Sequence, residues 1–146
     1  MKISSSAFAN NSFIPSKYTY DGQDINPPLK IENVPAEAKS LVLIVDDPDA
    51  PMGRWVHWTV WNINPKTTEI LEASVPKGAV EGLTDFGRPG YGGPCPPSGS
   101  HRYFFKIYAL DKILTLEKDS RIERLEEDMK GHIKDQAQLL GLYQRK

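Results

Sequence analysis

Three carboxylates follow the most apolar run of the sequence. The run Leu41–Val45 contains only aliphatic residues, and the segment Asp46–Pro51, with the sequence D-D-P-D-A-P, comes directly after it. Carboxylates at the rim of a core must be hydrogen-bonded, paired or functional, because burying an unpaired charge is costly. The two prolines restrict the backbone and therefore aim these side chains. Such a run predicts either a polar turn, which Asp and Pro commonly form, or one edge of a functional site.

Two of the three histidines lie at the start of strand-like segments. His57 belongs to the segment W-V-H-W, where strand alternation places it on the same face as Trp55 and Thr59. His101 follows a loop rich in glycine and proline and shares a strand face with Tyr103. A lone histidine on a strand is most often an ordinary core residue. Together, however, imidazole, phenol and glycine-loop N–H groups are the donors that hold phosphate or carboxylate oxygens, so they predict a pocket for a small anion.

We expect each of these groups to have its own role. The two imidazoles would present N–H donors to the anion, Tyr103 would supply a hydroxyl, and Asp47 would orient an imidazole or receive an ammonium group. A carboxylate beside an imidazole favours the charged ring, which in turn favours an anion. Arg102 points to the opposite strand face from His101, so we expect it to be structural and to pair with Asp49.

The elements that must position these groups are mostly strands. Prolines and glycines interrupt most helical patterns in the first two thirds of the chain. The runs that predict strands are Leu29–Ile31, Leu41–Val45, Trp55–Ile63 and Tyr103–Leu110. We therefore expect a mainly β protein, an antiparallel β-sandwich with one helix in the C-terminal region, formed as a single domain by residues 1–146.

One helix is expected near the C-terminus. Ser120 and Glu123 have the spacing of a capping box, and Gly131 is expected to end the helix. An apolar stripe at helical spacing lies between them: Ile122, Leu125 and Met129. For the segment Ile133–Tyr143 we expect a short helical turn followed by a last strand.

Composition excludes several classes of protein. The chain has 18 Lys and Arg against 19 Asp and Glu, a net charge of −1, so it lacks the basic field that non-specific nucleic-acid binding needs. No stretch has the apolar length of a membrane span, and Met1–Ser6 lacks the pattern of a secretory signal. The single cysteine, Cys95, excludes an internal disulfide framework and fits a reducing compartment. We therefore expect a cytoplasmic protein with no nucleic-acid partner and no membrane span.

Taken in order, three motifs resemble those of the phosphatidylethanolamine-binding protein family, which includes the Raf-kinase-inhibitor-like proteins. They are D-P-D-A-P at 47–51, W-x-H at 55–57 and G-x-H-R-Y at 99–103, within a looser similarity from Tyr18 to Tyr143. The loop Pro94–Pro97 is similar to the bacterial and archaeal branch. The resemblance implies a large antiparallel sheet packed on a smaller one, and a pocket that takes phosphate, acetate or a phospholipid headgroup. The pocket residues that it implies are Asp47, Trp55, His57, Gly93, Pro94, His101 and Tyr103.

The resemblance has further implications. It implies a homodimer, and a cis peptide bond within the D-P-D-A-P run, which here would join Ala50 to Pro51. Eukaryotic members carry a longer insertion before Trp55 that contributes a pocket tyrosine. Only Met52–Arg54 occupies that place here, so we expect Tyr91 to serve instead.

The function that these observations favour is non-enzymatic binding, with no cofactor and no metal. The ligand would be phosphate, a phosphorylated molecule or a phospholipid headgroup, and a kinase or protease would be a potential regulated partner. An alternative is a protease or kinase inhibitor that acts through the surface loops Pro65–Leu71 and Asp85–Tyr91, independently of the pocket.

Two chemical alternatives use the same residues. A hydrolase could take Cys95 as nucleophile with a histidine and Asp47, but this cysteine lies between prolines and not at a helix N-terminus, and the sequence has no G-x-S-x-G motif. A metal site could use Asp47, His57 and His101, but no H-x-H or H-x-x-x-H spacing exists to form it in advance.

Overall fold

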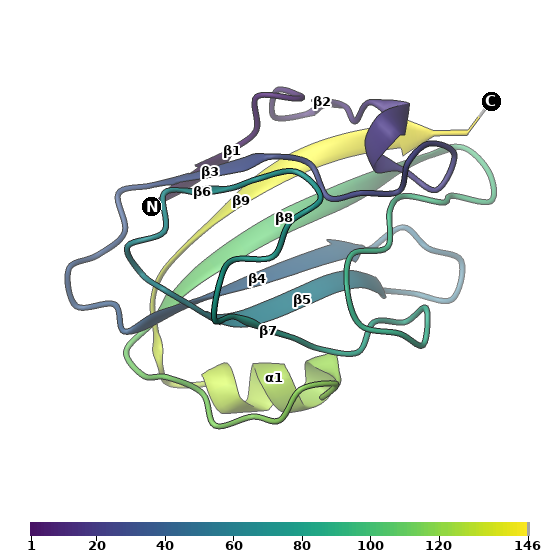
Figure 1. Cartoon of the computed structure of the whole chain (residues 1–146). Helices are drawn as coiled ribbons and strands as arrows, with labels where there is room; N and C mark the ends of the chain where they lie inside the picture. Colours follow the sequence, from purple (N-terminus) through teal and green to yellow (C-terminus); the bar gives the residue numbers. More distant parts are fainter. Residues whose placement is uncertain (146) are drawn as a thin grey trace.

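Two β-sheets and one short α-helix make up the computed structural model, which describes residues 1–145 (Figure 1). The large sheet has the strand order β2-β9-β8-β4-β5-β7, where the strands are β2 Ser12–Phe13, β4 Ser40–Asp47, β5 Trp55–Ile63, β7 Val80–Glu81, β8 Ser100–Leu110 and β9 Ile133–Gln144. The small sheet has the order β1-β3-β6, where the strands are β1 Lys2–Ser4, β3 Leu29–Glu32 and β6 Glu69–Ile70. Only the short β2–β9 pair is parallel among the strand pairs of residues 1–145. The predicted mainly β sandwich is confirmed.

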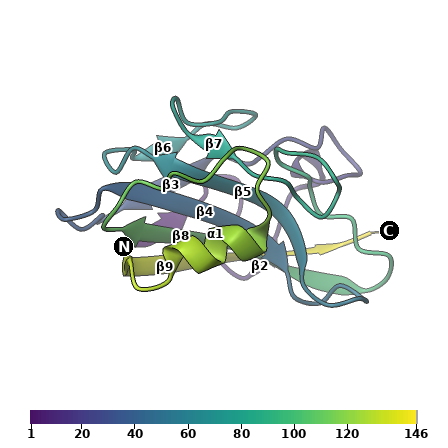
Figure 2. The same cartoon turned by 90° about the horizontal axis from the view of Figure 1, so that it is seen from below.

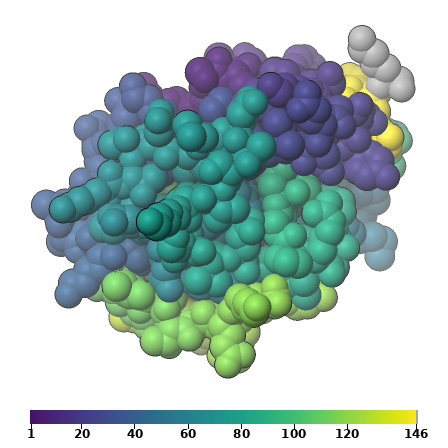
Figure 3. Space-filling model, viewed as in Figure 1, coloured from purple at the N-terminus to yellow at the C-terminus, as the bar shows by residue number. Residues whose placement is uncertain are grey.

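The main core lies between the two sheets. Leu43, Val45 and Val60 of the large sheet pack with Leu29 and Ile31 of the small one. In the space-filling view, the segments around residues 65 to 100, coloured teal to green, cover much of the face seen in Figure 1 (Figure 3). Every residue of β4 is buried, as its uninterrupted apolar run predicts for a central strand.

A second apolar cluster covers the opposite face of the large sheet. There the helix α1, Ile122–Met129, lies below the sheet in Figure 1 and in front of it in Figure 2. Its buried side chains pack with Val42, Ile44 and Trp61. The large sheet is therefore covered on one side by the small sheet and the loops, and on the other by α1.

The ends of α1 differ in part from the expectation. The helix begins at Ile122 after the N-cap Arg121, which makes no side-chain capping bond, and the Ser120 hydroxyl instead donates to the carbonyl oxygen of Glu117 at 2.7 Å. The predicted capping box is therefore wrong, because the turn before the helix uses that hydroxyl. Gly131, with φ of 78°, follows the helix end as expected. In the described part of the chain, no helix is both long and apolar enough to cross a membrane.

The segment after the helix is strand from Ile133 onward. It pairs with β8 along nearly its whole length, from Ile133 opposite Leu110 to Gln144 opposite Ser100. The expected helical turn at its start is therefore wrong, because backbone pairing with the longest neighbouring strand extends to that end of the segment.

Candidate functional site

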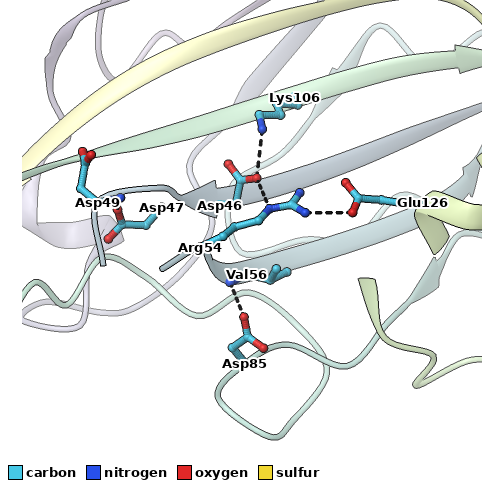
Figure 4. Close-up of polar contacts among 8 residues, drawn as sticks. All are labelled: Asp46, Asp47, Asp49, Arg54, Val56, Asp85, Lys106 and Glu126. Atoms are coloured by element: carbon cyan, nitrogen blue, oxygen red, sulfur yellow. Dashed lines mark hydrogen bonds and ion pairs between the residues drawn. The ribbon is translucent and has the colours of Figure 1, made fainter. Parts of the chain in front are cut away.

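The three carboxylates after the apolar run point in three directions (Figure 4). Asp46 and Asp47 are adjacent on β4, so they face opposite sides of the large sheet. Asp46 lies on the side of α1, Asp47 lies on the side of the main core, and Asp49 lies in the following turn. Each has a different set of partners, and only Asp47 lines a cavity.

Asp46 is the centre of an ion-pair network under the sheet. Its Oδ2 accepts hydrogen bonds from Arg54 Nε at 2.7 Å and from Lys106 Nζ at 3.0 Å. Arg54 also donates to Glu126 Oε1 of α1 at 2.9 Å, so the network joins the helix to the sheet (Figure 4). Because every charge in it has an opposite partner, we interpret this cluster as structural.

Asp49 forms the predicted pair with Arg102. The guanidinium donates from Nε to Oδ2 at 3.0 Å and from Nη2 to Oδ1 at 2.9 Å, and the backbone N–H of Arg102 adds a bond of 2.9 Å to Oδ2. These hydrogen bonds lower the pKa of the Asp49 carboxyl. The pair ties the turn after β4 to the start of β8, and so fixes two walls of the cavity relative to each other.

A cavity of about 320 Å³ lies where β4 ends and β5 and β8 begin. Antiparallel pairing of β4 with both neighbours brings these three ends together, with Asp47 opposite Trp55 and Asp46 opposite Phe104. Five predicted site residues line it: Asp47, Trp55, His57, His101 and Tyr103. The other lining residues are Ala50, Pro51, Phe86, Cys95, Pro96 and Pro97.

Asp47 orients the imidazole of His101. The ring nitrogen Nδ1 lies 2.7 Å from Asp47 Oδ2 and donates to it, since an ionised carboxylate only accepts. The other carboxylate oxygen accepts the backbone N–H of Asp49 at 2.7 Å. Both side chains are buried, with Asp47 3% and His101 7% exposed. The Nε2 of His101 has no hydrogen bond within residues 1–145, which leaves it available to the cavity.

A β-bulge places His57 in the same cavity. Val45 pairs with Trp58 and Asp46 pairs with Val56, so His57 is the extra residue between them. Trp58 packs in the main core while His57 lines the cavity, so these consecutive side chains lie on one side of the sheet.

The bulge also corrects one expectation about faces. Thr59 lies beside Trp61, which packs against α1 on the other side of the sheet. The predicted face shared by His57 and Trp55 is confirmed, since both line the cavity, but the inclusion of Thr59 in that face is wrong.

The hydrogen bonding of His57 favours a neutral ring. Its Nδ1 donates to the carbonyl oxygen of Gly92 at 2.7 Å, and its ring packs edge-on against Phe86 and Tyr103. Burial lowers the pKa of this imidazole. The charged form that was expected for His57 is therefore disfavoured, because desolvation outweighs the nearby carboxylates. Its Nε2 offers the cavity a lone pair.

Tyr103 brings an unused donor to the site. Its side chain is 1% exposed, and its hydroxyl has no hydrogen-bond partner in the described part of the chain. Burial raises the pKa of this phenol, so the hydroxyl keeps its proton. An unpaired buried hydroxyl costs roughly 1 to 3 kcal/mol, which a ligand oxygen in the cavity would recover.

Comparison with known proteins identifies the fold family. A family model described as phosphatidylethanolamine-binding protein matches residues 4–144. The chain belongs to this family. A UPF0098 protein of Pyrococcus horikoshii is 54% identical over 97% of this chain and 76% of its own length, and one of Methanothermobacter thermautotrophicus is 50% identical over 99% of both chains.

Two solved structures share the architecture closely. A putative phosphatidylethanolamine-binding protein homologue from Chlamydia trachomatis superposes with a TM-score of 0.95 at 45% identity, over 99% of this chain and 97% of its own. YbcL of Escherichia coli, described as a member of the mammalian phosphatidylethanolamine-binding protein family, gives 0.93 at 29% identity, over 99% and 98%. The fold and family inferred from the three motifs are confirmed.

Two residues that the family resemblance implies for the pocket lie behind its wall. The backbone N–H of Gly93 donates to Asp24 Oδ1 at 2.7 Å, and a Cβ on Gly93 would approach the Tyr18 carbonyl oxygen to 2.7 Å. The carbonyl oxygen of Pro94 accepts the N–H of Tyr20 at 3.0 Å. Neither Gly93 nor Pro94 lines the cavity. They anchor the start of the 95–97 wall, and only glycine fits the close approach at 93.

The other two expectations about this family pocket are corrected. Tyr91 does not line the cavity: its hydroxyl donates to the Tyr18 carbonyl oxygen at 2.7 Å and its ring packs edge-on against Trp58. No peptide bond among residues 1–145 is cis, so the implied cis bond between Ala50 and Pro51 is not present, although both residues line the cavity.

Phe86 lines the cavity, although no motif in the sequence predicts it. It contacts Trp55 and His57 edge-on, at centroid distances of 5.5 and 5.2 Å. Its loop carries no motif. The neighbouring Asp85 ties the loop to β5, since its carboxylate accepts the N–H of Val56 at 2.7 Å and its own N–H donates to the Val56 carbonyl oxygen at 3.0 Å (Figure 4).

The geometry gives little support to either chemical alternative. The only hydrogen-bonding contact of the Cys95 thiol within residues 1–145 is Arg145 Nη1 at 3.6 Å, and no histidine nitrogen reaches it. Among the same residues, no three His, Cys, Asp or Glu side chains cluster as metal ligands would.

Proposed function

We propose that this member of the phosphatidylethanolamine-binding protein family is a non-enzymatic protein whose cavity binds a small phosphate-bearing anion. The observation that carries the proposal is the convergence of three polar groups with unused hydrogen-bonding capacity on one cavity: the Nε2 atoms of His57 and His101 and the hydroxyl of Tyr103. Two of these groups come from β8 and one from β5, so the sheet holds them rigidly.

The cavity has the size and composition of a small-molecule site. Its volume of about 320 Å³ falls at the lower end of ligand pockets, and its walls combine aromatic and proline side chains with a few polar groups. Free phosphate and a phospholipid headgroup share the chemistry that these groups recognise. A binding role is supported over hydrolysis because, within residues 1–145, the one thiol at the cavity wall is in contact with Arg145 and not with a histidine that could activate it.

The test uses the three histidines in one spectrum. Inorganic phosphate is titrated into labelled protein while NMR follows the ring signals of His57, His101 and His132. The first two rings are expected to shift with one saturable curve. His132 serves as an internal control, because it bonds Asp111 at 2.8 Å and lies outside the cavity. If the signals of His57 and His101 stay in place at saturating phosphate, or if all three move together, the proposal is wrong.

A further inference from the structure

In both cavity histidines, a hydrogen bond at Nδ1 fixes the tautomer. Nδ1 of His57 donates to a backbone carbonyl, and Nδ1 of His101 donates to the Asp47 carboxylate. In each ring, the remaining nitrogen, Nε2, is the one left for a ligand. A neutral imidazole can offer only a lone pair at that position.

The two rings differ in what their Nδ1 atoms contact. Nδ1 of His101 lies 2.7 Å from a carboxylate oxygen, Oδ2 of Asp47. His57 contacts only a neutral carbonyl and aromatic rings, and burial lowers its pKa. The neutral ring is therefore favoured at His57, and its Nε2 is the acceptor of the site. An oxygen that carries only negative charge would be repelled by its lone pair, whereas a hydroxyl group would donate to it.

The charge of the cavity favours the same kind of ligand. None of the residues that line it is Lys or Arg. The groups with ionisable side chains that face it are Asp47 from β4, His57 from β5, His101 and Tyr103 from β8, and Cys95 from the loop before β8. Arg145 touches Cys95 from outside these walls, but it donates two hydrogen bonds to Asp21. A fully ionised oxyanion would thus meet a carboxylate without a fixed cation.

We propose that the cavity selects oxyanions that carry an acidic proton, as hydrogen phosphate and phosphate monoesters do, over oxyanions that carry none. The P–O–H group donates to His57 Nε2, and the unprotonated oxygens accept from the Tyr103 hydroxyl and lie beside Nε2 of His101. This assignment rests on the proposed anion site and adds to it the protonation state of the ligand.

The test compares four probes on the wild-type protein near pH 6, where about half of a phosphate monoester carries a proton. Inorganic phosphate and methyl phosphate have the proton. Sulfate has the same shape but no proton, and dimethyl phosphate has a single negative charge but no proton. Calorimetry is expected to show binding of the first pair at least about tenfold tighter than of the second, because a buried acceptor is left unpaired in the second pair.

The outcomes separate the two proposals. If sulfate or dimethyl phosphate binds as tightly as phosphate, the selection for a proton is wrong and the anion site stands. If none of the four probes binds, the anion site itself is wrong, and the selection with it. A free anion and an esterified one are distinguished by the relative affinities of phosphate and methyl phosphate.

A variant at His57 tests whether this residue causes the selectivity for a protonated ligand. In His57→Gln, an amide that can donate replaces the fixed acceptor, so the preference for phosphate over sulfate should shrink at least about threefold. The matched control is His132→Gln, which makes the same change outside the cavity and should keep the wild-type ratio. An unchanged ratio in a folded His57→Gln protein would contradict the assignment, and the four-probe series on wild type decides the question if that variant does not fold.

Discussion

Two adjacent aspartates at the end of β4 differ in their surroundings: Asp46 belongs to an ion-pair network, and Asp47 lines the cavity of the proposed anion site. On the face toward α1, Asp46 Oδ2 pairs with Arg54 and Lys106, and Arg54 extends the network to Glu126. The other oxygen, Oδ1, is buried without a partner among residues 1–145, but it does not line a cavity. On the opposite face, Asp47 orients one imidazole beside a cavity that the unpartnered Tyr103 hydroxyl also lines. Paired charges stabilise a fold, whereas unpaired polar groups that line a cavity are available to a ligand. Mutations that remove one group at a time from each face test this distinction.

The largest effect is expected at the structural face. Asp46→Ala leaves Arg54 and Lys106 without their shared partner and should lower the free energy of unfolding by about 2 to 3 kcal/mol. Phosphate affinity of the folded protein should change by less than about threefold. Urea denaturation and calorimetry measure the two quantities. Asp111→Ala is the matched control, since Asp111 also pairs with two partners, His132 and Lys134, but on the surface, and should cost less than about 1 kcal/mol.

At the binding face the order of effects reverses. Asp47→Asn removes the carboxylate that accepts from Nδ1 of His101 and orients its ring, so phosphate affinity should fall by about tenfold or more, while the free energy of unfolding falls by only about 1 kcal/mol. The same denaturation and calorimetry experiments apply. If Asp47→Asn lowers the free energy of unfolding as much as Asp46→Ala does but keeps its phosphate affinity, Asp47 is structural as well.

Removing the unpaired hydroxyl should separate binding from stability most clearly. In Tyr103→Phe, phosphate affinity is expected to fall by about fivefold, because one donor is lost. The free energy of unfolding should stay the same or rise by up to about 1 kcal/mol, since the variant no longer buries an unsatisfied group. Tyr91→Phe is the control: its hydroxyl is hydrogen-bonded to a carbonyl outside the cavity, so it should lose stability and keep affinity. A stable Tyr103→Phe protein with unchanged affinity would exclude the hydroxyl from the site.

The smallest effect is a pH dependence from His57. Because the pKa of His57 is lower in the folded state than the usual histidine value of 6.5, the unfolded chain binds a proton first as the pH falls. The stability present above about pH 6.5 should therefore decrease below it, with a slope under about 1.4 kcal/mol per pH unit. The pKa of Asp49 is lowered from its usual value of 3.8, so this carboxyl affects stability only at more acidic pH. Denaturation between about pH 7.5 and about pH 5, the titration range of histidine, should show a flatter profile for His57→Gln. An equal slope in both proteins would assign the effect to other groups.

Much of the sheet could be predicted because local patterns and tertiary burial agree. The uninterrupted apolar run of β4 requires burial on both faces of the sheet. The apolar stripe of α1 requires that one face of the helix packs against the protein. The ends of α1 could not be predicted as well. Ser120 has the residue type for a cap, but its hydroxyl has a nearer acceptor in the preceding turn, and such competition between local bonds is decided by backbone geometry.

The residues of the site could be predicted where they lie in sequence motifs. They could not be predicted where only tertiary packing brings them to the cavity. His57 and His101 could be found from their motifs, but the bulge that turns His57 into the cavity has no signal in W-V-H-W. Phe86 reaches the site from a loop without a motif. Gly93 has a role that its residue type supports, but close packing against Tyr18 places it behind the wall rather than in the pocket.

The central claim, that two imidazoles and a phenol jointly hold a phosphate-bearing anion, is tested most directly by a crystal structure of the protein soaked in inorganic phosphate. The account predicts one tetrahedral density within hydrogen-bonding distance of His57 Nε2, His101 Nε2 and the Tyr103 hydroxyl, with the Asp47–His101 contact retained. Well-ordered density for this cavity that contains no anion at saturating phosphate, or phosphate bound only elsewhere on the surface, would contradict it.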